Sequence, residues 1–180
     1  MMGDAEHSEF PGDWSKDGRT IAVARGPGWG TEIWLYDLES EETRPLQRGA
    51  AEQYYPSFSP DGKFLAYTSR ETGRNEVFVR ELADDGRAWQ VSLEGGDGPR
   101  WRGDGRELFF RGTDGFLHAV DVALGDEVTL GRPTPLFRAR MRFEDGYEYD
   151  VAPDGQSFVI NSWIEEEVPR AMSLVLNWSP

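Results

Sequence analysis

The sequence contains no cysteine and only two histidines among its 180 residues. Disulfide bonds, thiol catalysis and cysteine-ligated zinc are therefore excluded. No apolar run approaches the roughly 20 residues needed to span a bilayer. The acidic N-terminal stretch also lacks the apolar core of a signal peptide, so we expect any export signal to lie outside this chain. These absences leave the cellular compartment open.

Basic side chains are in the minority, since 19 Lys and Arg stand against 33 Asp and Glu, for a formal net charge of −14. Such a chain repels phosphate backbones and anionic membrane surfaces, so neither nucleic-acid binding nor membrane insertion is expected. The surplus of carboxylates favours solubility, and it would also suit a cationic ligand or a basic protein partner.

Aromatic residues and turn formers are abundant. The chain has seven Trp, six Tyr and ten Phe, together with 21 Gly and 11 Pro. Aromatic side chains pack well on the pleated surface of a sheet, and Gly and Pro favour turns. With 38% hydrophobic residues, the composition predicts a folded all-β domain with many turns.

An Asp-Gly pair between two apolar runs occurs four times, and the aspartates are separated by 44, 43 and 50 residues. Glycine supplies the positive φ that a tight hairpin turn needs, and the Asp side chain can hold that turn. Four copies in one context indicate structural turns rather than ligand contacts. The period is typical of β-propeller blades. The pairs are Asp17-Gly18, Asp61-Gly62, Asp104-Gly105 and Asp154-Gly155.

The residues after each pair also align. Positions four, five and six beyond the aspartate are apolar in all four copies. Because side chains alternate along a strand, these positions predict a middle strand that is buried on both faces. A further strand is expected over residues 32–39, 76–83, 116–122 and 171–178. A weaker outer strand is expected near residues 43–47, 88–93 and 127–130.

The second copy, FSPDGKFLAYTS at residues 58–69, resembles the PD40 (WD40-like) repeat of TolB-like propellers. The other copies depart from it, since Lys16 and Gly103 replace the proline. The ending, from YDVAPDGQSFVINS to SLVLNWSP, is similar to the last blade of propellers fused to bacterial serine/threonine kinases. The resemblance implies a bacterial protein, either extracytoplasmic (for example periplasmic) or cytoplasmic.

The resemblance also implies a β-propeller of four β-meander blades. We expect the blades at about residues 13–53, 54–97, 98–140 and 141–180, after a mobile N-terminal extension of residues 1–12. Such propellers usually have six or more blades. The four repeats could close on themselves, form part of a larger ring, or be completed by a second chain. An open arc would expose apolar blade faces, which predicts a homo-oligomer formed through the terminal blades.

Loops at the mouth of the propeller channel are the expected binding site. They carry the aromatic and arginine residues that most often anchor partners: Trp29, Tyr54, Arg74, Arg100 and Tyr147. No catalytic set, metal site or cofactor is predicted. The chain has no G-x-S-x-G elbow, and His118 lies in a predicted strand without ligand-spaced partners.

The sequence therefore favours a non-catalytic module that binds a protein or peptide. One alternative is a carboxylate-based hydrolase or lyase with its site at the channel mouth. Another is a structural fragment that completes a propeller ring by self-association.

Overall fold

A computed structural model describes residues 8–27, 31–49, 51–83, 85–125, 127–139, 141, 148–162 and 172–175. These residues form β-strands and no helix, and the strands are arranged in four antiparallel sheets. This confirms the predicted all-β propeller-type architecture. No helix able to span a bilayer occurs in the described part of the chain.

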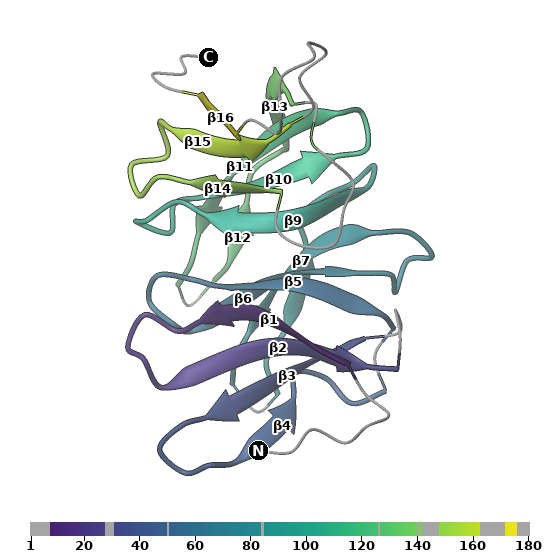
Figure 1. Cartoon of the computed structure of the whole chain (residues 1–180), viewed down its shortest axis with the longest axis vertical. Coiled ribbons are helices and arrows are strands. Elements are labelled where there is room, and N and C mark those ends of the chain that lie inside the picture. Colours follow the sequence, from purple (N-terminus) through teal and green to yellow (C-terminus); the bar gives the residue numbers. More distant parts are fainter. Residues whose placement is uncertain are drawn as a thin grey trace.

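The four sheets follow one another along the chain (Figure 1). The first contains β1 (Ser8–Trp14), β2 (Thr20–Gly26), β3 (Glu32–Asp37) and β4 (Thr43–Pro45). The second contains β5 (Gln53–Phe58), β6 (Phe64–Ser69), β7 (Glu76–Glu81) and β8 (Ala88–Gln90). The third contains β9 (Gly96–Trp101), β10 (Glu107–Gly112), β11 (Phe116–Ala123), β12 (Thr129–Leu130) and β13 (Thr134–Arg138). The fourth contains β14 (Tyr149–Val151), β15 (Phe158–Asn161) and β16 (Met172–Val175).

The predicted middle and third strands are confirmed in all four copies, and the outer strands in the first three. Two strands differ from expectation. β13, which pairs with β11 beside β12, was not predicted. β1 begins at Ser8, inside the stretch expected to be an extension. Its first four side chains are exposed, so no apolar alternation marks this strand in the sequence.

The hydrophobic core is divided among the gaps between successive sheets. In the first gap, Leu65 and Tyr67 of β6 pack with residues of β2 and β3. The alternate β6 residues, Phe64 and Ala66, pack in the second gap against the third sheet. All four side chains are at most 5% exposed. The middle strand is therefore buried on both faces, as the aligned apolar columns predict.

The described sheets form an open arc. Inner strands contact one another in the order β1, β5, β9 and β14. The first and fourth sheets lie at opposite ends of the long axis (Figure 1). Within the described residues the arrangement is thus an arc of four blades rather than a ring that closes on itself.

Each Asp-Gly pair lies in the turn between an inner and a middle strand. The four glycines have φ values from 72° to 75°. In each turn the aspartate Oδ1 accepts a hydrogen bond, 2.9–3.1 Å long, from the backbone N–H two residues later. In the first two copies a serine hydroxyl also donates to this oxygen, from Ser15 at 2.7 Å and from Ser59 at 2.6 Å. In these two copies the aspartate therefore connects the residue that precedes the turn with the residue that follows it.

We expect Gly62→Ala to lower the free energy of unfolding by about 1 kcal/mol, because Gly62 has a φ of 72° that alanine disfavours. A Cβ at Gly62 would meet no atom within 4 Å, so backbone strain alone is tested. Gly125→Ala is the control, since its Cβ also meets nothing and Gly125 is not among the positive-φ glycines. Urea unfolding measures both variants, and equal stability losses would contradict the assignment.

Candidate functional site

A small cavity lies beside the first residues of the inner strands β5, β9 and β14. It is on the side of the sheets opposite the Asp-Gly turns. Three repeats contribute its lining residues: Tyr55, Asp97, Gly98, Arg111, Met141, Glu148 and Tyr149. The cavity volume is about 10 Å³, which is room for about one water molecule. This end of the molecule also carries the loops that lead from β4 to β5, from β6 to β7 and from β8 to β9. These are the loops in which a binding site was predicted.

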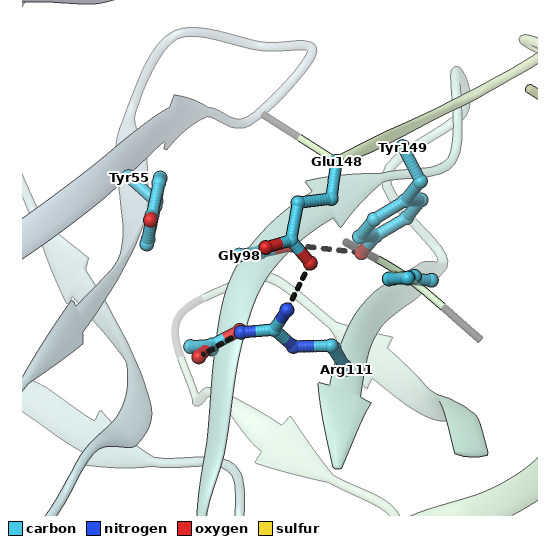
Figure 2. A pocket seen from close by; sticks show the side chains of 7 residues that line it. Tyr55, Gly98, Arg111, Glu148 and Tyr149 are labelled. Carbon is cyan, nitrogen blue, oxygen red and sulfur yellow. Dashed lines mark hydrogen bonds and ion pairs between the residues drawn. The ribbon is translucent and has the colours of Figure 1, made fainter. Parts of the chain in front are cut away.

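Arg111 of β10 joins the repeats at this cavity. Its Nη2 donates to Oδ2 of Asp97 on β9 at 2.6 Å, and its Nη1 donates to Oε2 of Glu148 just before β14 (Figure 2). The three side chains are only 10%, 18% and 11% exposed. Burial disfavours the charged guanidinium, but the two carboxylates outweigh it and raise the pKa of Arg111 above its usual value. In this cluster one guanidinium therefore binds two carboxylates, and all three groups are largely buried.

The register of the third sheet brings Arg111 to Asp97. The two residues are directly opposite each other in the β10–β9 pairing, so their side chains lie on one face. Arg111 is the last residue of the run ELFFR, and every residue of β10 after Glu107 is buried. A charged residue there signals a buried ion pair, because an isolated buried charge is too costly. That signal was present in the sequence, yet Arg111 was not among the predicted site residues.

Two tyrosines flank the ion pairs. The Tyr149 hydroxyl donates to the Gly98 carbonyl at 2.8 Å, and burial raises the pKa of Tyr149. Figure 2 shows Tyr55 on the other side of the cavity. Tyr55 has a φ of 52° and lies at the register shift between Tyr54 and Ser57. Left-handed backbone at a residue other than glycine is strained, and such strain is concentrated at functional sites.

Tyr54, one of the predicted site residues, lies on the same side of the sheets as the cavity but does not line it. Its hydroxyl donates to Oε2 of Glu52 at 2.7 Å, and Arg70 donates to the same oxygen at 2.9 Å. Burial and the Glu52 carboxylate raise the pKa of Tyr54 to about 12. Tyr54 therefore belongs to a separate hydrogen-bonded group on the second sheet, beside the cavity residue Tyr55.

The predicted arginines also lie outside the cavity lining. Arg74 Nε donates to Oε1 of the fully buried Glu76 at 2.6 Å, and its Nη2 donates to the Leu93 carbonyl at 2.7 Å. Arg100 donates to the Pro99 carbonyl at 3.0 Å and lies 3.8 Å from Asp150. Both arginines thus connect neighbouring segments of the chain. The other two predicted residues, Trp29 and Tyr147, lie outside the described residues.

The described lining of the cavity consists of charged, aromatic, apolar and glycine residues. This described lining contains no serine, threonine or histidine, and the described residues include no group of three potential metal ligands. His118 lies elsewhere in the third sheet, with Nε2 3.1 Å from both carboxylate oxygens of Asp114 and its ring stacked on Phe110. What the cavity offers is oriented hydrogen-bonding groups and aromatic surface.

Part of this chain is similar in sequence to two groups of known proteins. Residues 29–102 match the family model described as the dipeptidyl peptidase IV (DPP IV) N-terminal region. The Tol-Pal system protein TolB of Xanthomonas oryzae pv. oryzae (strain PXO99A) is 29% identical over 102 residues, which cover 54% of this chain and 23% of the relative. The same protein of Xanthomonas campestris pv. campestris (strain B100) matches to the same extent. The chain therefore spans less than a quarter of the length of the curated relatives it matches.

Solved structures share the fold over most of the chain. TolB from Acinetobacter baumannii superposes with a TM-score of 0.65 at 16% identity, covering 94% of this chain and 44% of that one. A puromycin-hydrolyzing peptidase of Mycobacterium tuberculosis has a TM-score of 0.61 at 21% identity, covering 87% and 28%. At these identities the likeness concerns the fold alone. The similarity of the last copy to kinase-fused propellers stays a prediction.

Proposed function

This chain carries TolB-like β-propeller blades, and we propose that it is a non-catalytic module that binds a protein or peptide at the cavity around Arg111. The partner would lie across the starts of β5, β9 and β14 and contact three repeats at once. Tyr55, which is partly exposed, would supply aromatic contact area, and the charged cluster would orient polar groups of the partner.

The construction of the cavity carries this proposal. Ion pairs with Asp97 and Glu148 hold Arg111 in place, so little ordering is needed when a partner binds. Tyrosine and arginine are also the residue types that most often dominate binding energy. The cavity volume of about 10 Å³ is far below the roughly 300–1,000 Å³ of small-molecule sites. A partner lying across the surface therefore fits better than an enclosed small substrate.

The relatives support a protein partner in a limited way. The curated relatives are named as the TolB protein of the Tol-Pal system, and this chain covers only part of their length. A carboxylate-based hydrolase or lyase is the second proposal, which the geometry favours less because both carboxylates of the cavity bind Arg111.

A displayed library of random peptides, selected against the immobilised chain, tests the proposal. We expect Tyr55→Asn to weaken binding of the selected peptides about tenfold, because it removes an aromatic anchor. Asparagine tolerates the left-handed backbone at this position better than most residues, so the fold should be preserved, and circular dichroism checks this.

Trp14→Ala is the control, because Trp14 is 57% exposed on the first sheet, from which no described residue lines the cavity. It should leave peptide affinity unchanged. If no peptide is enriched, or if the enriched peptides bind Tyr55→Asn as tightly as the unmodified chain, the proposed function is wrong.

A further inference from the structure

The face of the first sheet that points away from the second sheet carries large apolar side chains. The opposite face buries Ala22, Ile33 and Leu35 in the core, so the alternate residues must point outward. Cross-strand pairing places them on one face: Trp14 is opposite Ile21, Ile21 opposite Tyr36, and Val23 opposite Trp34. None of these five side chains is fully buried, and Trp14 is 57% exposed.

The same positions form the contact with the preceding sheet in every later copy. The residues four and six positions after the aspartate are Leu65 and Tyr67, Leu108 and Phe110, and Phe158 and Ile160. Each pair packs in the gap before its own sheet, and all six are at most 3% exposed. In the first copy these positions are Ile21 and Val23. The first sheet thus carries the side chains of a sheet-to-sheet interface, with no neighbour in the described residues.

The open face of the fourth sheet is the one that, in the first three sheets, packs against the following sheet. The residue five positions after the aspartate packs against the following sheet in the first three copies, as Ala22, Ala66 and Phe109. In the fourth copy this residue is Val159, which is 37% exposed. In the first two gaps, the smaller side chains on this kind of face lie against larger ones from the next sheet. The open face of the first sheet is thus of the kind that packs against a preceding sheet, and the open face of the fourth sheet is of the kind that packs against a following sheet.

We propose that the exposed face of the first sheet binds the exposed face of the fourth sheet in a second copy of this chain. Each contact would repeat the packing that joins successive sheets within the chain. Two such contacts, related by a twofold axis, would join two arcs into one closed assembly. This association uses surfaces remote from the cavity around Arg111, so it stands or fails independently of peptide binding.

The available area explains why both contacts are needed. Strands lie about 4.8 Å apart and rise about 3.3 Å per residue, so the four strands of the first sheet present a face of roughly 400 Å². The described fourth sheet has three shorter strands and presents less than half of that area. The smaller face limits each contact to well below the roughly 800 Å² per partner of a stable interface, so the two contacts must form together and the association is weak. We therefore expect a concentration-dependent dimer, with no accumulation of longer open chains.

Sedimentation equilibrium over a range of concentrations measures the association of the 180-residue chain. We expect a dimer, and we expect Val23→Lys and Val159→Lys each to raise its dissociation constant on the order of 100-fold, because each buries a charge in an apolar contact. Leu38→Lys is the matched control. Leu38 is a 46% exposed leucine in the turn after β3, on neither face, and its substitution should leave the dissociation constant unchanged.

Three results would overturn the proposal. The first is a monomeric chain at every concentration, which would leave the face to additional repeats or to another protein. The second is a dimer weakened by only one of the two lysine variants, which would indicate a contact between identical faces. The third is a dimer weakened by neither. If Val23→Lys reduces cooperative unfolding, Trp14→Lys tests the same face at a more exposed position.

Discussion

Arg111→Met is expected to lower the free energy of unfolding by about 3–5 kcal/mol, the range found when one partner of a buried ion pair is removed. Arg111 pairs with both Asp97 and Glu148, and all three side chains are less than a fifth exposed. Methionine keeps much of the side-chain volume, so the loss reflects charge rather than packing. Two carboxylates would then be left close together in a site that water hardly reaches. Urea unfolding at neutral pH measures the change.

A second substitution separates this effect from general damage. Asp97→Asn in the Arg111→Met background should recover part of the stability, because one of the two uncompensated charges is removed. Arg70→Met is the surface control. Arg70 pairs with Glu52 at 2.9 Å, but the two side chains are 50% and 39% exposed, so little change is expected. Equal losses for Arg70→Met and Arg111→Met would show that burial of the Arg111 cluster does not matter.

Phe158→Ala is expected to cost about 3–5 kcal/mol, as is usual for removal of a buried aromatic ring. Phe158 is fully buried between the third and fourth sheets. Its ring centre lies 5.1 Å from that of Phe109, at an interplanar angle of 86°, and 5.4 Å from that of Phe137, at 69°. Truncation would leave a cavity and remove both edge-to-face contacts. Urea unfolding reports the overall loss.

Hydrogen exchange should show that the loss is uneven. Among the described residues, each sheet makes its extensive contacts with its neighbours along the arc, so stability is propagated from sheet to sheet as in repeat proteins. Amides of β15 should lose protection at lower denaturant than those of β6. Val159→Ala is the matched control, because Val159 is the next residue, points to the opposite face and is 37% exposed. If Val159→Ala were as damaging as Phe158→Ala, the assignment of the two faces would be wrong.

Most of the strand order could be predicted because its determinants are local. The turn at Asp61-Gly62 depends on the conformational freedom of one glycine and on one side-chain acceptor. The burial of Leu65 and Ala66 on opposite faces follows from the two-residue period of a strand. β1 was missed at its start because the side chains of Ser8 to Pro11 are exposed and leave no apolar pattern.

The candidate site was only partly predictable because its partners are distant in sequence. Asp97 and Glu148 are 14 and 37 residues from Arg111. The register of β9 on β10 and the docking of the fourth sheet bring them together. Choosing loop residues that are typical anchors pointed to the side of the molecule on which this cavity lies. It led to Tyr54 rather than Tyr55, because the register shift in β5 has no signature in the sequence.

By itself, the sequence determined the all-β class, the four repeats, the turns between their strands and the two-sided burial of the middle strands. These features depend on backbone conformation and side-chain alternation within a few residues. Only the tertiary structure decided that the described sheets form an open arc, that three repeats surround Arg111, and that no described sheet covers the face of the first sheet that carries Trp14, Ile21 and Val23. Those features depend on how whole sheets stack, and stacking is set by contacts between residues far apart along the chain.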